Sequence, residues 1–344
     1  MKELTLIVPG LAEAFAGATP EVLSECAALA HLLGKGRRVD RLPATFHELL
    51  CAEFGLFRDA GKDLPIAALS ALADDHNLPE GIWMRIDPIH LLAGMDGLIL
   101  QALAEENLSQ HDAILLAAPL KELFKTYHWE LKVPVPTRWY LQLERAPGLA
   151  TRAPSEVLGK NIRNFMPAGH DRGTWDRIVN EAQMLLHDCE LNRQRETQGL
   201  PPINSIWLWG CGALPEILPR LWNRVYADLP EVAGLAMISA TTRGPLPQTA
   251  DELLARDDPG GKTIVVMEHL PTAAMRRENA GIEAVIQRLE NIWAAPLLAA
   301  VETGEIAGLR MLSERRGYIY DNWSRFCFWR RPADLAGFQH AQDD

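Results

Sequence analysis

The sequence predicts an α/β protein, with a mostly parallel β-sheet flanked by helices and an inserted α+β subdomain. Short β-branched runs alternate with helical patterns in both outer thirds of the chain, which is the order that builds parallel sheets. In the middle third, short strand patterns and turns surround the helices instead. The 344 residues, 48% of them hydrophobic, can bury the core of one large domain with an insertion. We therefore expect an α/β core over 1–80 and 201–344, and an inserted subdomain over 81–200.

The first third predicts one buried strand followed by helices. Leu4 to Val8 is a short apolar run that ends at Pro9-Gly10, as a buried strand does before a loop. Apolar residues then recur at helical spacing until Gly34. Helices are predicted over 20–33, 45–57 and 65–72.

The middle third predicts short strands joined by turns, with two long helices. Asp87-Pro88 and Met95-Asp96-Gly97 are turn sequences, and Ser109 suits the N-cap of the helix that follows it. The pattern predicts strands over 82–86, 90–93, 98–100, 129–133 and 138–143, and helices over 109–127 and 174–198.

The last third returns to alternating strands and helices. An aromatic, β-rich run follows Pro201-Pro202 and ends at Gly210-Cys211-Gly212, where a helix is expected to begin. The pattern predicts strands over 204–209, 234–239 and 263–267, helices over 215–226, 251–255 and 281–301, and a final hairpin over 309–312 and 317–320.

Composition limits the classes of partner. A net charge of −11, without a long basic run, disfavours nucleic-acid binding. Five scattered cysteines without a C-x-x-C pair predict neither a disulfide framework nor a structural zinc site. No apolar stretch approaches the roughly 20 residues that cross a bilayer, and the start, MKELTLIVPGL, is typical of a strand rather than a signal peptide. We expect a soluble cytoplasmic protein with no nucleic-acid or membrane partner.

The segment LNRQRETQGLPPINSIWLWGCG carries the main candidate site. Asn192 and Arg195 share a helix face, and arginine offers a planar fork for a carboxylate or phosphate. Gly210 and Gly212 would present backbone amides between a strand and a helix, where anions bind, with Asn204 at the start of the strand. Structural alternatives stay open: Arg195 bonds the carbonyls of its own helix end and Asn204 closes a turn, while the glycines serve only a tight turn.

A second cluster, WMRIDPIHL, contributes Arg85, Asp87 and His90. Arg85 and Asp87 project to the same side of a strand, and Asp87 before Pro88 is a favoured turn start. These residues are candidates for a substrate clamp with a titratable histidine beside it. The structural alternative is an Asp-capped turn with an ion pair.

Three further features are weaker candidates. His47-Glu48-x-x-Cys51 has the spacing of a zinc helix but lacks the second histidine. Glu268-His269 follows a buried strand, where α/β proteins often place catalytic groups. The tail YIYDNWSRFCFWRRP crowds aromatic residues next to Arg330-Arg331, which favours core packing or a partner surface over base stacking on an acidic chain.

The motif N-x-x-R-x-x-x-G-L-P-P-x-N, followed by a strand and G-x-G, resembles archaeal-type cofactor-independent (2,3-bisphosphoglycerate-independent) phosphoglycerate mutases. The matching residues are Asn192, Arg195, Gly199, Leu200, Pro201, Pro202, Asn204, Gly210 and Gly212. From end to end, the chain also resembles bacterial regulatory proteins of the RpfE type, through IVPGL, WMRIDPIHL, NEAQMLLHDCELN, LPPINSIWLWGCG and FWRRP.

The mutase resemblance implies a degenerate alkaline-phosphatase-like fold and chemistry on two divalent metals with a phosphorylated Ser or Thr. This sequence departs from that pattern. Pro9-Gly10 stands where the mutases have Asp-Gly after the first strand, and Glu268-His269 stands where they have an aspartate and a histidine cluster. Thr19-Pro20 is a single echo of the nucleophile.

We therefore expect the mutase reaction, the metal centre and any cofactor to be absent. The resemblance then leaves a small-anion-binding or regulatory protein, with a phosphorylated or carboxylated small molecule or a protein as its partner. The expected pocket residues are Arg85, Asp87, His90, Asn192, Arg195, Asn204, Gly210 and Gly212. The alternative is an active metal-dependent mutase or phosphatase with diverged ligands, using Mn or Zn.

Overall fold

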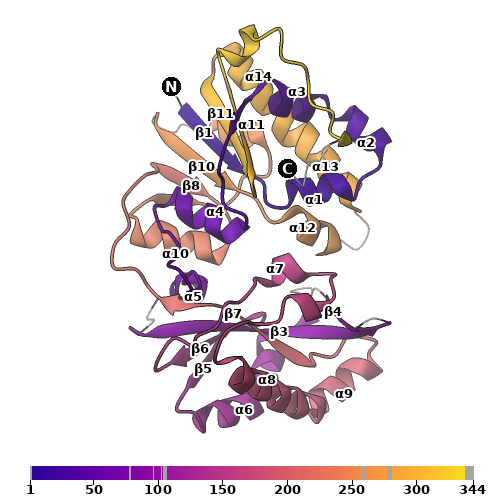
Figure 1. Ribbon diagram of the computed structural model, residues 1–344, viewed down its shortest axis with the longest axis vertical. Helices are drawn as coiled ribbons and strands as arrows, with labels where there is room; N and C mark the ends of the chain where they lie inside the picture. The colour runs from indigo at the N-terminus through magenta and orange to yellow at the C-terminus, as the bar shows by residue number, and fades with distance from the viewer. Residues whose placement is uncertain are drawn as a thin grey trace. The chain divides into compact units, whose positions relative to one another are not determined.

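The computed structural model describes residues 2–76, 79–95, 97–101, 103, 107–256, 260–276 and 281–337. Contacts divide the chain into a sheet unit, Met1–Leu56 with Ile217–Asp344, and an inserted unit, Phe57–Glu216 (Figure 1). The inserted unit is wider at both ends than the expected 81–200. No helix of the described residues is long and apolar enough to cross a membrane.

The sheet unit is built on seven strands in the order β2-β12-β11-β1-β10-β8-β9. The five strands from β11 to β9 run parallel, and β12 is antiparallel to both β11 and β2. This mostly parallel sheet confirms the predicted fold class. The strands are β1 (Lys2–Ile7), β2 (Arg37–Val39), β8 (Arg224–Tyr226), β9 (Thr242–Gly244), β10 (Lys262–Val266), β11 (Ile306–Ser313) and β12 (Arg316–Asp321).

Helices cover both faces of this sheet (Figure 1). Leu6 of β1 packs with Leu29 and Leu297 from the helices of one face, and Ile7 is buried on the opposite side of the strand. Burial on both faces explains why the parallel strands are continuous apolar runs. The helices are α1 (Leu11–Ala16), α2 (Pro20–Glu25), α3 (Ala27–Lys35), α4 (Phe46–Glu53), α10 (Pro230–Ile238), α11 (Ala250–Ala255), α12 (Leu270–Arg276), α13 (Ile282–Leu289), the π-helix η3 (Glu290–Ala294), α14 (Ala295–Thr303) and the short 3₁₀-helix η4 (Ser324–Phe326).

The inserted unit is an antiparallel sheet with helices on both faces. Its strands run β4-β3-β6-β5, and β7 pairs with the other side of β3. Met84 and Ile86 of β3 face a core formed with α6 and α8, whereas Trp83 packs with α5. The elements are α5 (Ile66–Asp74), β3 (Ile82–Gly94), β4 (Gly97–Gln101), α6 (Gln110–Lys125), β5 (Glu130–Val135), β6 (Arg138–Leu143), α7 (Pro154–Val157), the 3₁₀-helix η2 (Ile162–Asn164), α8 (Arg172–His187), α9 (Glu190–Thr197) and β7 (Ser205–Ala213).

The strand β7 corrects two expectations. It pairs antiparallel with β3 and therefore belongs to the inserted unit, although the sequence placed it in the α/β core. It also continues through Gly210-Cys211-Gly212 to Ala213, so these glycines do not form a turn that opens a helix. Gly212 pairs with Trp83 of β3, beyond a register shift between Trp83 and Arg85. Strand β7 therefore stays paired with β3 past these glycines.

Four other local predictions were wrong. Residues 215–223 are irregular and 224–226 form the strand β8, because Pro215 and Pro219 interrupt helical hydrogen bonding. Residues 234–238 lie in α10, which begins at Pro230 and is C-capped by Ser239, rather than in a strand. The helix predicted over 174–198 is two helices, α8 and α9.

The fourth concerns Asp87-Pro88, which is not a turn but part of the continuous strand β3. Pro88 lies between the stretch of β3 that pairs with β6 and the stretch that pairs with β4, so one side of the strand has no partner there. A proline is tolerated at such a position. Asp96, in the predicted hairpin turn after β3, lies outside the described residues.

Candidate functional site

Two asparagine side chains hold the segment that enters β7. Asn192 of α9 donates to the carbonyls of Leu186 at 2.7 Å and Ile203 at 2.8 Å, and its oxygen accepts from the Ile203 N–H at 2.8 Å. Asn204 accepts from the Leu91 N–H at 2.8 Å and donates to the Leu91 carbonyl at 2.9 Å. Both side-chain amides thus bond backbone groups, of Ile203 and of Leu91, in place of a partner strand.

Arg195 fixes the same segment from the next turn of α9. Its Nε donates to the carbonyl of Pro201 at 3.1 Å and its Nη1 to the carbonyl of Asn107 at 2.6 Å. These carbonyls do not belong to its own helix, which corrects that structural alternative. Burial lowers the pKa of Arg195, opposed by the charge of Asp112. Its Nη2 is buried without a hydrogen-bond partner among the described residues.

His90 of β3 adds a third contact to the proline-rich segment. Its Nδ1 lies 2.7 Å from the carbonyl of Pro202, and because a carbonyl can only accept, Nδ1 carries the proton. Side chains from α9 and β3 thus bond the backbone of three successive residues, Pro201 to Ile203. The motif N-x-x-R-x-x-x-G-L-P-P-x-N therefore has a structural role in this chain.

The two glycines of β7 allow close packing. Gly210 has φ +68° and donates its N–H to the Thr151 hydroxyl at 3.1 Å, and a Cβ there would lie 3.0 Å from Ile66. A Cβ on Gly212 would lie 2.8 Å from the side chain of Pro65. The absence of side chains lets the start of α5 approach the sheet.

Arg85 and Asp87 form the ion pair that was the structural alternative for their cluster. Arg85 donates twice to Asp87, at 2.9 and 2.8 Å, and the Trp209 indole donates to the same carboxylate at 2.8 Å. The guanidinium also lies 4.7 Å from the Trp209 ring centre. Burial raises the pKa of Asp87, while the charge of Arg85 opposes the rise.

The sequence reasoning missed a second ion pair on the same face. Arg138 of β6 donates to both oxygens of Asp74 on α5, at 2.8 and 2.9 Å, and the Tyr140 hydroxyl donates to Asp74 as well. The alternation of Arg138 and Tyr140 along a strand was the available signal, since both project to one face. These contacts fasten α5 to the sheet.

Asp63 is a further buried acid near β7. It accepts from the N–H of Thr151 at 3.1 Å and from the Thr151 hydroxyl. Burial raises its pKa, and the hydrogen bonds from Thr151 oppose the rise. The thiol of Cys211 lies in the same surroundings, where burial raises its pKa to about 12.

All eight predicted pocket residues lie in the inserted unit, and six of them belong to β3 and β7 or precede β7 directly. Apart from the Arg195 Nη2, the polar side-chain groups described above bond protein partners. An anion-binding role for this set stays a prediction.

A different edge of the structure brings together the loops of the sheet unit. The parallel strands β1, β10 and β11 end side by side, and their carboxyl ends are where open α/β sheets bind ligands. The Gly10 N–H after β1 donates to both oxygens of Glu314 after β11, at 3.2 and 3.0 Å. The Ser313 hydroxyl donates to the same carboxylate at 2.7 Å. No local motif marks Glu314, because its position depends on strands far apart in the sequence.

Gly10 and His269 lie in close contact at this edge. Gly10 has φ +74°, and a Cβ there would lie 2.7 Å from Nε2 of His269 and 2.6 Å from Pro271. His269 shares a hydrogen bond with the Thr272 hydroxyl at 3.0 Å through Nδ1, and its Nε2 lies 3.6 Å from Glu13. Both ring nitrogens therefore face protein groups.

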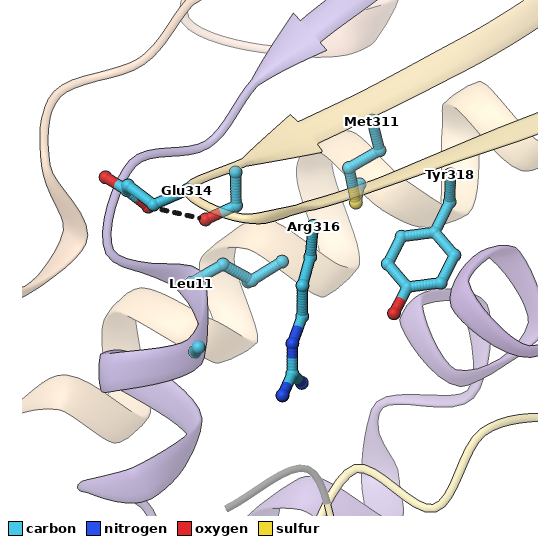
Figure 2. Close-up of a pocket in the computed structure, with 7 residues that line it drawn as sticks. Leu11, Met311, Glu314, Arg316 and Tyr318 are labelled. Carbon is cyan, nitrogen blue, oxygen red and sulfur yellow. Dashed lines mark hydrogen bonds between the residues drawn. The ribbon is translucent and has the colours of Figure 1, made fainter. Parts of the chain in front are cut away.

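A pocket opens beside these loops (Figure 2). The hollow measures about 280 Å³ with open solvent included, whereas the cavity that a water-sized molecule can occupy is about 10 Å³. Arg316 extends from β12 past Leu11, and Tyr318 lies farther along the same strand (Figure 2). Burial raises the pKa of Tyr318, opposed by the charges of Arg316 and Arg38. The lining residues are Leu11, Ala12, Met311, Ser313, Glu314, Arg316 and Tyr318.

The residues His47 and Cys51 of α4, which have part of the spacing of a zinc helix, are buried in the structure. His47 lies 3.4 Å from Glu231 of α10, and both side chains are buried. Cys51 is also buried, which raises the pKa of its thiol well above the ordinary value. The contact joins two helices of the sheet unit.

The donors at the strand ends do not fit the two-metal centre that the mutase resemblance implies. Pro9 has no side-chain donor, and both oxygens of Glu314 accept hydrogen bonds from the protein. Across the residues that the structure describes, no three His, Cys, Asp or Glu side chains are grouped so as to hold a metal ion.

Fold and site together define a mixed α/β protein whose sheet is mostly parallel. In sequence, the chain is distantly similar to archaeal-type cofactor-independent phosphoglycerate mutases. It is 40% identical to the 2,3-bisphosphoglycerate-independent phosphoglycerate mutase of Methanothrix thermoacetophila over 73 residues, 21% of this chain and 18% of that protein. It is 31% identical to the Methanosarcina barkeri protein of the same name over 87 residues, 25% of this chain and 20% of that protein. The match thus spans about a fifth of these relatives, and no family model matches the chain.

The PH0037 protein, a solved structure, shows the same fold at low sequence identity. The PH0037 protein from Pyrococcus horikoshii aligns with a TM-score of 0.54 and 15% identity, over 98% of this chain and 92% of that chain. The cofactor-independent phosphoglycerate mutase from Thermoplasma acidophilum aligns with a TM-score of 0.38 and 15% identity, over 94% and 90%.

Proposed function

We propose that this chain is a phosphoglycerate-mutase-like protein that lacks two-metal phosphoryl transfer and acts as a small-anion-binding regulatory protein. The main support comes from the carboxyl ends of β1 and β11. There the Glu314 carboxylate accepts hydrogen bonds from the Gly10 N–H and the Ser313 hydroxyl, so both of its oxygens already have protein partners. Two-metal chemistry stabilises charge only where several oxygen and nitrogen ligands converge. The resemblance to regulatory proteins of the RpfE type supports the regulatory part.

The ligand that we propose is a phosphorylated or carboxylated small molecule bound in the strand-end pocket. Arg316 is a basic side chain of this pocket, and a guanidinium can bind a carboxylate or phosphate through two parallel hydrogen bonds. The Glu314 carboxylate lines the same pocket and accepts hydrogen bonds from Gly10 and Ser313, which hold it in place without removing its negative charge. The cavity itself, about 10 Å³, has room for about one water molecule, so the ligand that we propose would lie at its opening with its anionic group against Arg316.

The enzymatic part is tested by metal analysis and a mutase assay. We expect the purified chain to contain no stoichiometric divalent metal and to interconvert no phosphoglycerates with manganese present. Two bound metal ions per chain together with turnover would instead establish the alternative, an active mutase or phosphatase with diverged ligands.

The binding part is tested by ligand-dependent melting with 3-phosphoglycerate as the first probe. A ligand at about 100 times its Kd should raise the melting temperature by roughly 3–8 °C, because it binds only the folded state. Arg316→Ala should abolish the rise, whereas Arg315→Ala, in the adjacent turn and outside the pocket lining, should retain it.

A third variant separates the two candidate pockets. Arg195→Ala lowers the melting temperature of the free protein, because Arg195 holds two backbone carbonyls, so the ligand-induced rise is the quantity to compare. A rise that survives in Arg316→Ala and is lost in Arg195→Ala would place the site in the inserted unit. The anion-binding proposal fails if phosphorylated and carboxylated probes leave the wild-type melting temperature unchanged.

A further inference from the structure

The C-terminal stretch Trp323–Arg331, here called the aromatic segment, is held in a fixed conformation after β12. The Asp321 carboxylate accepts from the backbone N–H groups of Trp323 and Ser324, both at 3.0 Å. Cys327 N–H then donates to the Ser324 carbonyl at 3.2 Å, and Arg330 N–H donates to the Cys327 carbonyl at 3.0 Å. Side chains on this segment are therefore presented without a large cost of ordering on binding.

Four large aromatic side chains on this segment are exposed. Trp323 is 80% exposed, Phe326 59%, Phe328 85% and Trp329 67%. Together they present about 600 Å² of largely apolar surface, given the size of aromatic side chains. Summed over the four side chains, of which Phe328 and Trp329 are in ring contact, this area is below the roughly 800 Å² that each partner contributes to a stable interface, so neighbouring side chains must supply the rest. Tryptophan, phenylalanine and arginine are also the residue types enriched at interface centres.

Charged side chains of both signs surround the aromatic segment. Arg325 donates to the carbonyl of Glu302 at 3.2 Å, which places it beside the acidic turn 302–305. Arg331 and Asp334 are exposed along the same stretch of chain. Such a surface is self-complementary, because a two-fold axis can set the arginines of one copy opposite the carboxylates of the other. A lipid surface or a nucleic acid, by contrast, offers mainly negative charge to a chain of net charge −11.

We propose that the aromatic segment is the contact surface for a second copy of this chain, in a two-fold symmetric dimer. The proposal is independent of the strand-end pocket and of any ligand bound there.

The test is the oligomeric state of the full chain by sedimentation velocity across a concentration series. We expect a concentration-dependent dimer that the double variant Trp323→Ser, Phe328→Ser converts to a monomer. Each substitution should raise the dimer Kd roughly 30-fold or more, as expected for aromatic anchors. At concentrations where both proteins are monomeric, the double variant should have the same melting temperature as the wild type, because these exposed side chains contribute little to the stability of the fold.

Phe57→Ser is the matched control, because Phe57 is 73% exposed on the inserted unit, outside the segment. It should leave dimerisation unchanged. The proposal is overturned by a wild-type monomer at all concentrations, by a double variant that dimerises like the wild type, or by equal loss in Phe57→Ser. It is also overturned if a monomeric wild type sediments with phosphatidylcholine–phosphatidylglycerol vesicles and the double variant does not, which would assign the segment to a lipid surface.

Discussion

At the scale of single residues, Asn192 substitutes for missing backbone pairing between α9 and the segment that enters β7. Its side chain makes three hydrogen bonds, to Leu186 and Ile203. Asn192→Ala leaves these buried groups without partners and should lower the free energy of unfolding by about 2–4 kcal/mol. Urea unfolding measures the change. Gln194→Ala, exposed on the same helix, should change it by less than about 0.5 kcal/mol, and equal effects of the two variants would contradict the assigned role.

Asp63 predicts a dependence of stability on pH. Burial raises its folded pKa above the ordinary 3.8. The folded state therefore binds the proton more tightly than the unfolded state, so the contribution of Asp63 to stability falls as pH rises from about 3.8 through the raised pKa. Asp63→Asn cannot ionise. The free energy of unfolding of the wild type minus that of the variant should therefore decrease as pH rises over this window in urea titrations, and a constant or increasing difference would refute the assignment.

Sequence reasoning identified polar residues that matter to the structure but could not assign their partners. Asn192, Arg195 and Asn204 carry strong polar groups, and their types suit an anion as well as a backbone carbonyl. The choice depends on whether a chain segment lies within hydrogen-bonding distance, as Pro201 and Ile203 do here. Periodicity does not contain that information.

At the scale of elements, the β1–α1 connection depends on a glycine in contact with His269. Gly10→Ala places a Cβ at φ +74° and within 2.7 Å of the imidazole, so the connection must shift. We expect a loss of about 2–4 kcal/mol in the free energy of unfolding. Gly304→Ala is the matched control, since Gly304 has φ +81° with nothing within 4 Å of the added Cβ. It should cost only the backbone strain, about 1–2 kcal/mol, and equal losses would exclude a packing contribution at Gly10.

Elements buried on both faces were the most predictable from sequence. β1 and β10 match the predicted runs to within two residues, because a strand covered on both sides reads as a continuous apolar run. The same rule misled at α10, whose apolar run is buried as a helix and carries no distinguishing period. The edge that joins Gly10 to Glu314 could not be read at all, since it arises only when distant strands pair.

At the scale of the whole molecule, the inserted unit is a continuous stretch of chain with its own core. A fragment of residues 57–216 should therefore fold alone and unfold cooperatively in urea, as followed by circular dichroism. The shorter fragment 81–200 lacks α5 and β7, including the buried Ile206 and Leu208, and should not fold. If the shorter fragment unfolds as cooperatively as the longer one, β7 does not contribute to the core as described.

The pairing of β1 also sets an order of events during synthesis. Glu3 pairs with Lys262, about 260 residues later, and Lys2 with Ile306. At roughly 5–20 residues per second, the ribosome completes the inserted unit before β10 and β11 are made, so β1 stays without its two partner strands for tens of seconds. The apolar run Leu4 to Val8 is thus an unpaired strand during synthesis, open to wrong pairing until the last third of the chain emerges.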